Sequence, residues 1–219
     1  MAHVLRIDSS PRAARSHTRR LTGMFVEMWL RQHPADAVSH RDVGLQPLPP
    51  VSESWIAAAF HPAAERTAEM RAALSLSDEL VDELLLADLL VLGVPMYNFG
   101  IPAQLKAYID QIVRIGRTFA FEPHDTAQPY KPLTHGKRAV VIVSSGDAGY
   151  GPGECLARFN HVEPYLRTVL EYIGIRQIDF AYAGYDEFGG ERLQRSLTAA
   201  LARINRLALQ NSSPLARTA

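Results

Sequence analysis

Short apolar runs, separated by amphipathic segments, predict an alternation of β-strands and helices along the chain. Leu89 to Val94 is an almost unbroken apolar run, and so is Ala139 to Val143 within a strand that starts at Arg138. Such runs are typical of strands buried on both faces of a parallel sheet. Val4 to Ile7 and Gln177 to Ala183 predict two further strands, and the weakly patterned Ala37 to Arg41 predicts a fifth.

Apolar residues three and four positions apart predict helices between these strands. The first helix spans Thr18 to Gln32 and carries Leu21, Met24, Phe25, Met28 and Trp29 on one face. Ser77, followed by two acids, is typical of a helix start, because serine caps and acids favour the positive end of the helix dipole. The remaining helices are predicted from Ser77 to about Asp88, Pro102 to about Ile115, Val162 to Gly174 and Gly190 to Leu209.

Strands that alternate with helices predict an α/β fold, because parallel strands need crossover connections. We expect an open parallel five-stranded sheet in the flavodoxin-like order 2-1-3-4-5, with helices on both faces. One domain spans residues 1–209, with insertions at about 43–76 and 116–137 and a flexible tail at 210–219. A cluster of prolines predicts a loop early in the first insertion, where 55–60 and 63–76 are candidate helices. The second insertion is expected to be a long loop.

Composition and charge narrow the class of protein. The 219 residues contain 23 Lys and Arg against 23 Asp and Glu, so the formal charge is zero, which disfavours binding to nucleic acids or anionic membranes. The one cysteine, Cys155, excludes an internal disulfide and predicts a reducing compartment, and we expect a small buried or half-buried thiol. The N-terminus lacks the pattern of a secretory signal, and the longest apolar stretch is too short to span a membrane. A cytoplasmic protein is therefore expected.

The turn after the first strand is a candidate phosphate site. In sheets of this kind, ligands bind beyond the carboxyl ends of the strands, near the point where the strand order reverses. This turn contains neither GxGxxG nor GxxxxGK[ST], but it offers hydroxyl groups at a helix N-terminus. The candidate residues are Ser10, Ser16, His17 and Thr18. Alternatively, Ser16 or Thr18 simply caps the helix.

The turns after the third and fourth strands are candidate sites for a planar ring. The first places apolar and aromatic side chains between two prolines, and it comprises Pro95, Met96, Tyr97, Asn98 and Phe99. A packed turn of the core is the alternative, although an amide between two aromatic residues suits a core poorly. The second turn begins with Ser144, Ser145, Gly146 and Asp147, and it has four glycines in eight residues, which lets backbone amides approach a ligand.

These residues resemble the FMN-dependent NADH:azoreductase family, whose members are similar to the NAD(P)H:quinone reductases. The resemblance runs from Val4 to about Leu207, and its most specific parts are Ser9-Ser10 with Ser16-His17-Thr18, the stretch from Ala87-Asp88 through Pro95 to Phe99, and Gln104-Leu105-Lys106. It implies that the first turn holds the FMN phosphate, that Met96 to Phe99 line the isoalloxazine near N5, and that Ser144 to Asp147 lie at its pyrimidine end. The family often has Gln in place of His17 and Arg-Gly-Gly in place of Ser145-Gly146-Asp147. The positive charge that this arginine provides is absent here.

The resemblance also implies an activity and an assembly. Family members bind FMN as homodimers in which the partner subunit completes each active site. We therefore expect a ping-pong cycle, in which NADH or NADPH reduces the FMN and a quinone or azo compound then takes two electrons from it. No metal and no catalytic side chain is expected. Phe60, Phe121 and Tyr130 lie in the two insertions and would wall the acceptor pocket, unless each packs against its own domain.

Three other functions stay open from the sequence. A flavodoxin-type electron carrier would bind FMN without oxidising NAD(P)H directly, although such carriers are usually strongly acidic. A serine hydrolase using Ser10 or Ser145 lacks the G-x-S-x-G pattern, and no partner can be identified for His161. A flavin-binding regulator without catalysis is the third.

Overall fold

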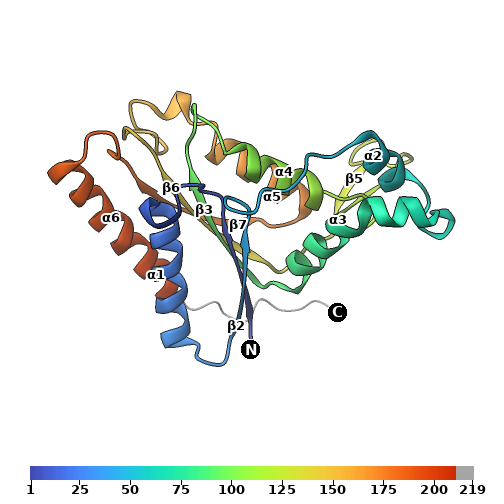
Figure 1. The fold of residues 1–219 in the computed structure, drawn as a ribbon, viewed down its shortest axis with the longest axis horizontal. Coiled ribbons are helices and arrows are strands. Elements are labelled where there is room, and N and C mark those ends of the chain that lie inside the picture. The colour runs from blue at the N-terminus through green and yellow to red at the C-terminus, as the bar shows by residue number, and fades with distance from the viewer. Residues whose placement is uncertain (211–219) are drawn as a thin grey trace.

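A five-stranded parallel sheet forms the centre of the protein, and the computed structural model describes residues 1–210 (Figure 1). Its order is β2-β1-β3-β6-β7, which is the predicted order once two strands of a separate hairpin are counted. All four pairings are parallel, and Pro95 in β3 lies opposite Ser144 in β6. The strands are β1 (His3–Asp8), β2 (Ala37–Asp42), β3 (Leu89–Pro95), β6 (Arg138–Ser144) and β7 (Gln177–Ala183). The predicted tail lies, except for Gln210, outside the described residues.

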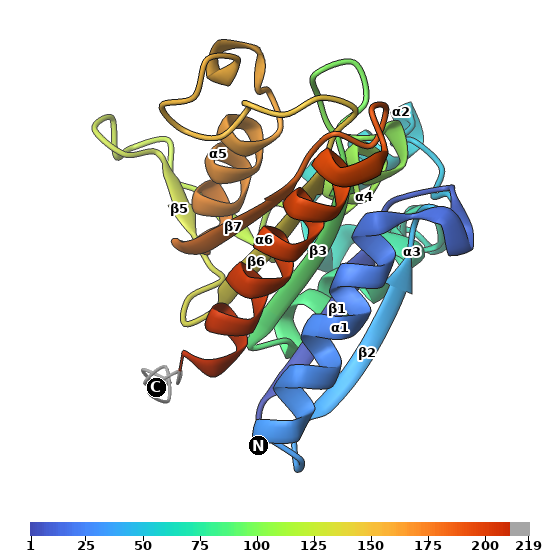
Figure 2. The same ribbon diagram turned by 90° about the vertical axis from the view of Figure 1, so that its left-hand side faces the viewer.

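Helices cover both faces of the sheet, as predicted. Helices α1 (His17–Gln32) and α6 (Gly190–Leu209) lie on one face, where Figure 2 shows them in front of the strands. Helices α3 (Ala68–Leu86), α4 (Ala103–Ile112) and α5 (Glu163–Ile173) pack on the other face. Alternate strand residues divide between the two cores: Leu5 and Ile7 face the α3–α5 side, and Val4 faces α1.

The first insertion differs from the sequence prediction, because helix α3 does not begin at Ser77. Its N-cap is Thr67, whose side chain accepts from the Met70 amide, and Ser77 lies buried in the middle of the helix. The Ser77 hydroxyl donates to the Gln111 carbonyl of α4 at 2.6 Å, so this serine joins two helices instead of starting one. Helix α2 (Glu53–Phe60) precedes α3 and packs against it.

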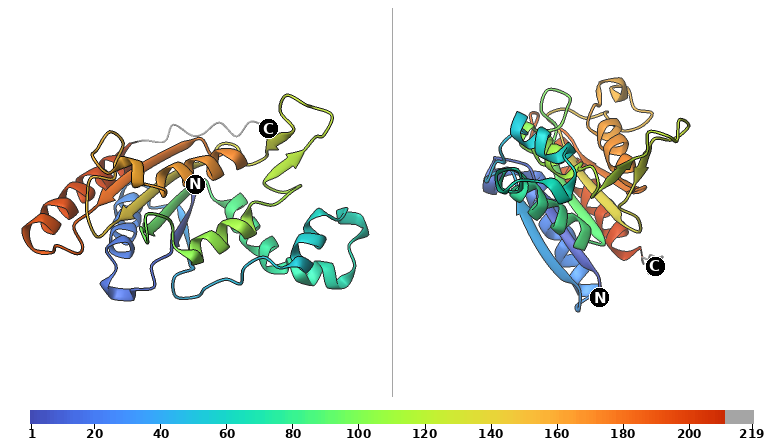
Figure 3. Two further views of the ribbon diagram at one scale, coloured as in Figure 1. Left: turned by 90° about the horizontal axis from the view of Figure 1, so that it is seen from above. Right: turned by 90° about the vertical axis from the view of Figure 1, so that its right-hand side faces the viewer.

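The second insertion is also more ordered than predicted. Strands β4 (Phe119–Phe121) and β5 (Tyr130–Pro132) form an antiparallel hairpin within the segment expected to be a loop. Each strand has only three residues, too few for a periodic pattern to show. Aromatic contacts hold the hairpin on α5, with the rings of Phe119 and Tyr172 5.1 Å apart. Figure 3 (left) shows the hairpin and the α2 region projecting from the same end of the molecule on separate sides.

Three short 3-10 helices lie in the segments between the main elements, at Ala13–Arg15, Ala63–Glu65 and Ala157–Phe159. Cys155 is exposed, so the expectation of a buried or half-buried thiol was wrong: it lies in a run of four exposed residues, 152–155, before α5 begins. Over residues 1–210, no helix is long and apolar enough to cross a membrane.

Candidate functional site

The β1–α1 turn presents unpaired amides at the start of a helix. Ser16 is the N-cap of α1, and its Oγ accepts from the Arg19 amide at 3.3 Å and lies 3.0 Å from Thr18 Oγ1. The amides of His17 and Thr18 come next, and the first amides of a helix have no partner within it. Together with the positive end of the helix dipole, these groups suit an anion. Ser16 therefore caps the helix and also borders the candidate anion site.

Ser10 is fixed by contacts that leave its hydroxyl hydrogen available. Its side chain is buried, and its Oγ accepts from the Arg12 amide at 3.3 Å. Arg19 donates from Nε and Nη2 to the Ser10 carbonyl at 2.8 and 2.6 Å. Gly44 also lies close to Ser10: a Cβ built on Gly44 would lie 2.4 Å from the backbone carbonyl oxygen of Ser10. The position of Ser10 therefore depends on residues from three segments of the chain.

Arg19 is neutralised by Asp42 and supports the turn without being free for a ligand. The guanidinium binds both oxygens of Asp42, at 2.6 and 2.5 Å. Hydrogen bonding to Asp42 is the main reason why the pKa of Arg19 is raised, although burial opposes it. Burial works against ionisation of Asp42, but the bonds from Arg19 and the Leu45 amide outweigh it and lower the pKa of Asp42.

The turn after β3 has a strained backbone. Tyr97 and Gly100 exchange both backbone hydrogen bonds at 3.0 Å, which closes a two-residue turn. Asn98 and Phe99 have φ of 47° and 69°, as a type I′ turn requires, and a bulky residue such as phenylalanine rarely adopts this conformation. In the described part of the chain, the Asn98 and Phe99 amides make no hydrogen bond. Strain of this kind is typical of functional sites.

The turn after β6 is fixed against the end of β7. The Ser145 amide donates to the Ala183 carbonyl at 3.0 Å, and its hydroxyl donates to the Asp147 carbonyl at 2.6 Å. A Cβ at Gly184 would lie 2.6 Å from that of Ala148, so only glycine allows this approach. Among residues 1–210, nothing bonds to the amides of Gly146 or Asp147, which are left for a ligand.

The fold brings the three turns to one edge of the sheet. The Ser9 amide and hydroxyl both donate to the Gly93 carbonyl of β3, at 3.1 and 2.7 Å. The Met96 amide donates to the Ser144 carbonyl at 2.7 Å, which joins the second turn to the third. Met96 is half-buried, whereas Tyr97, Asn98 and Phe99 are exposed. The edge thus combines hydroxyls and helix amides at one end with an exposed apolar and aromatic turn beside it.

A carboxylate that the sequence analysis missed also lies at this edge. Asp186, in the β7–α6 turn, pairs with Arg12 and lies 3.0 Å from Nε2 of His17. The two partners precede Asp186 by 174 and 169 residues, so no local pattern marks it.

The three predicted acceptor residues do not join the site within one chain. Phe121 and Tyr130 pair across the hairpin with their rings 5.2 Å apart, and Phe60, at the end of α2, is 66% exposed. Helix α2 and strand β5 lie at the end of the molecule remote from α1 and α6 (Figure 1). Phe60 therefore contributes little to its own core, whereas the hairpin residues pack on each other and on α5.

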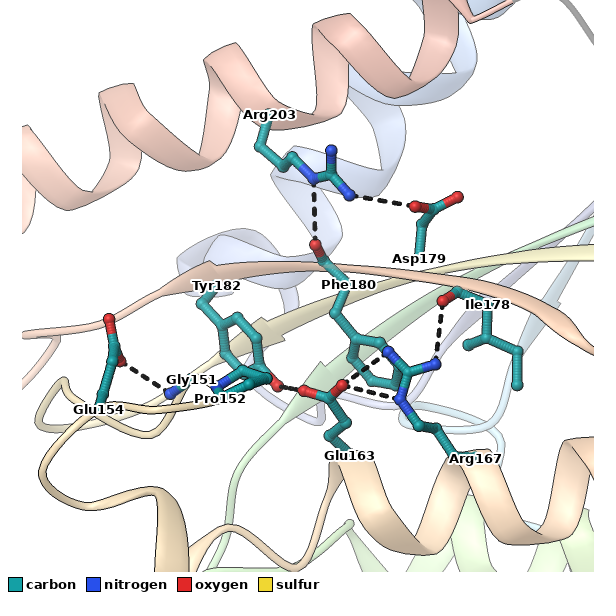
Figure 4. A pocket seen from close by; sticks show the side chains of 10 residues that line it. All are labelled: Gly151, Pro152, Glu154, Glu163, Arg167, Ile178, Asp179, Phe180, Tyr182 and Arg203. Atoms are coloured by element: carbon teal, nitrogen blue, oxygen red, sulfur yellow. Dashed lines mark hydrogen bonds and ion pairs between the residues drawn. The ribbon is translucent and has the colours of Figure 1, made fainter.

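A pocket of about 360 Å³ lies along β7 and is lined by residues of α5, β7 and α6 (Figure 4). Arg167 binds Glu163 and the Ile178 carbonyl, while Arg203 binds Asp179 and the Phe180 carbonyl. Tyr182 donates to Glu163, and burial, followed by this bond, raises the pKa of Tyr182. Because these charges are already paired, this pocket is not a candidate for the cofactor.

The groups at the sheet edge fit FMN. A phosphate needs several donors, which the His17 and Thr18 amides and the Ser10 hydroxyl provide. A flavin ring needs apolar contact on its faces and donors at its rim, which Met96, the Asn98 and Phe99 amides and the third turn provide. Among the described residues, no group of three or more His, Cys, Asp or Glu side chains is placed to hold a metal ion.

Comparisons with known proteins agree with this geometry. Residues 2–208 match a family model described as flavodoxin-like fold. The chain is 46% identical over 209 residues to FMN-dependent NAD(P)H:quinone oxidoreductase 1 of Pseudomonas aeruginosa, covering 95% of this chain and 99% of that one. It is 49% identical over 204 residues to the FMN-dependent NADH:quinone oxidoreductase of Nostoc punctiforme, covering 93% and 97%.

Solved structures share the fold. An azoreductase from Bacillus anthracis superposes with a TM-score of 0.83 at 24% identity, over 95% of this chain and 99% of that one. A FMN-dependent NADH-azoreductase from the same species, in complex with FMN, gives 0.82 at 20% identity, over 95% and 98%.

Proposed function

Because the chain belongs to the flavodoxin-like family that includes the FMN-dependent NAD(P)H:quinone oxidoreductases, we propose that it is an FMN-dependent NAD(P)H oxidoreductase that reduces quinones and azo compounds. The observation that carries this proposal is the convergence of three donor-bearing turns at the switch point of the sheet, in a chain 46% identical to such an enzyme. The resemblance seen in the sequence is thereby confirmed.

Bound FMN would accept a hydride from NADH or NADPH and pass two electrons to the acceptor, while the protein binds and orients it. Ser10, Ser16 and Thr18, with the first amides of α1, would hold the phosphate, and His17 would stand beside it. Pro95 and Met96 would support the ring, with the Asn98 and Phe99 amides at its rim. These roles rest on the amides at the start of α1 and in the β3 turn, which have no hydrogen bond among residues 1–210, and on the hydroxyl hydrogen of Ser10.

The third turn differs from the family pattern in its charge. Ser144 to Asp147 would offer the ring neutral donors, because no arginine stands at position 145. The Asp147 side chain accepts from the Ala148 amide at 2.7 Å and is thereby oriented within its own turn. Backbone amides, and not an arginine, would therefore be the donors that this turn offers to the pyrimidine end of the ring.

The rival functions have less support. Relatives covering nearly the whole chain are named as oxidoreductases that use NAD(P)H, which disfavours a pure electron carrier. For a hydrolase, Ser10 or Ser145 would need a nearby base, but Ser145 donates to a backbone carbonyl. Within residues 1–210, no histidine is hydrogen-bonded to either serine.

We further propose a cytoplasmic homodimer whose two active sites are shared. The support is the placement of α2 and the β4–β5 hairpin, which carry Phe60, Phe121 and Tyr130 and project from the end of the molecule remote from α1 and α6 (Figures 1 and 3). From there these side chains would reach a site on a partner. Light scattering after gel filtration should give twice the chain mass. Phe60→Ala and Tyr130→Ala should change the preference among quinones and azo compounds. Unchanged preference in both variants would contradict the role of these residues.

The visible spectrum of protein reconstituted with FMN tests the main proposal. Under anaerobic conditions, NADH or NADPH should bleach the flavin bands, and a quinone should restore them. Bound flavin that stays oxidised with both donors would indicate a carrier or regulator instead. Protein that binds no flavin would show that the three turns are structural.

A further inference from the structure

The side chain of Asp186, in the β7–α6 turn, contacts the β1–α1 turn, where the flavin phosphate is proposed to bind. It forms an ion pair with Arg12, and its Oδ1 lies 3.0 Å from His17 Nε2. A carboxylate only accepts hydrogen bonds, so Nε2 carries the hydrogen in this contact. The side chains of His17 and Asp186 are 19% and 23% exposed, so the contact is partly shielded from water.

The backbone holds Asp186 in this position. Its amide donates to the Ser145 carbonyl at 3.2 Å, and the next amide, that of Glu187, donates to the Gly146 carbonyl at 3.1 Å. Tyr185, directly before it, has a φ of 67°, a conformation that costs energy for a residue other than glycine. A strained, pinned turn thus directs one carboxylate at the β1–α1 turn.

Arg12 and His17 are the two side chains with which Asp186 pairs. Arg19, a half-buried cation beside this turn, is already paired with Asp42. Arg12 and His17 carry side-chain donors beside the start of α1, and Asp186 accepts from both. A phosphate held by the first amides of α1 would meet the same two side chains. Two anions that seek the same donors compete, and they also repel each other.

We propose that Asp186 is a built-in competitor of the flavin phosphate: it occupies Arg12 and His17 and so weakens the binding of phosphate-bearing flavins. This inference rests on the proposed function, because it assumes that FMN binds at the β1–α1 turn. By this competition, Asp186 lowers the affinity of the protein for FMN and favours its exchange with free FMN. Asp186 acts through two other side chains and is a positioning residue, not a catalytic one.

Asp186→Asn tests this inference, because the amide keeps the shape and one acceptor while removing the charge. Dissociation constants of FMN and of riboflavin, which has no phosphate, are measured by quenching of flavin fluorescence at low ionic strength. FMN should bind Asp186→Asn about fivefold or more tightly than wild type, on the order that Coulomb's law gives for nearby exposed charges, and riboflavin should bind equally to both. Glu27→Gln, an exposed residue further along α1, makes the same change in net charge and should alter neither constant.

A second measurement uses Arg12. Arg12→Gln should weaken FMN binding less than twofold in the wild-type background, where Asp186 holds the guanidinium. It should weaken binding about fivefold or more in the Asp186→Asn background, where the guanidinium is free for phosphate. Equal losses in both backgrounds would overturn the proposal. Asp186→Ser, which is uncharged and shorter, provides the same comparison if Asp186→Asn does not fold.

The outcomes separate this inference from the function on which it rests. FMN affinity that is unchanged or weaker in Asp186→Asn, or riboflavin affinity that rises equally, overturns the competitor role alone. Wild-type protein that binds neither flavin refutes the proposed function and, with it, this inference.

Discussion

Replacing Ser16 should separate its role in the helix from its role toward the flavin. Its Oγ accepts from the Arg19 amide and caps α1, and the same hydroxyl borders the proposed phosphate position. Ser16→Ala removes both functions, whereas Ser16→Gly removes the hydroxyl but keeps a residue that is tolerated at an N-cap. The two variants therefore differ in stability but not in what they offer the phosphate.

The magnitudes follow from the two kinds of hydrogen bond. Loss of the cap should cost about 1 kcal/mol in Ser16→Ala and only a few tenths of a kcal/mol in Ser16→Gly. For a chain of this size, the first change lowers Tm by about 2–4 °C. Loss of one hydrogen bond to a charged phosphate should cost about 1.5–3 kcal/mol of binding energy in both variants, a 10- to 150-fold rise in the FMN Kd.

The assay combines thermal unfolding of the apo-protein with titration of FMN and riboflavin. Riboflavin affinity should be the same in wild type and both variants, because riboflavin has no phosphate. If Ser16→Gly bound FMN as tightly as wild type, Ser16 would serve only as a cap. If riboflavin binding fell as far as FMN binding, the substitution would have deformed the site as a whole.

Three further changes test the packing and charge of the molecule. Tyr108 is buried, and in the described part of the chain its hydroxyl has no partner, so Tyr108→Phe should raise stability by about 1–2 kcal/mol in denaturant titrations; a loss would contradict this. Gly44→Ala should displace the Ser10 backbone, cost about 1–3 kcal/mol, and weaken FMN more than riboflavin in the same flavin titrations. The pKa of Asp42 is lowered in the folded protein, so its stabilisation is present above about pH 4 and is lost as the pH falls through the folded pKa. Asp42→Asn should therefore be less stable than wild type at pH 7, and the difference, measured by urea unfolding, should vanish in acid.

Much of the fold followed from local patterns in the sequence. The apolar runs of β3 and β6 predicted central strands, because a strand covered by helices on both faces has no polar side. The alternation with helices then predicted the strand order, and the order predicted the edge of the sheet at which a ligand would bind. The elements that escaped prediction were short or misleading: the strands of the hairpin have three residues each, and Ser77 looked like a cap but joins two helices.

The sequence by itself predicted which turns carry the candidate site, since their polar, aromatic and glycine-rich residues follow directly after strands. Only the tertiary structure decided which contacts fix those turns and which charged side chains surround them. Asp186 meets Arg12 across 174 residues, and Arg19 reaches Asp42, because the parallel sheet brings strand ends together that are remote in the chain. The periodic pattern of apolar residues predicts which side of its own helix or strand a residue occupies. The charge at a site depends on side chains from every element that meets there, which no local pattern contains.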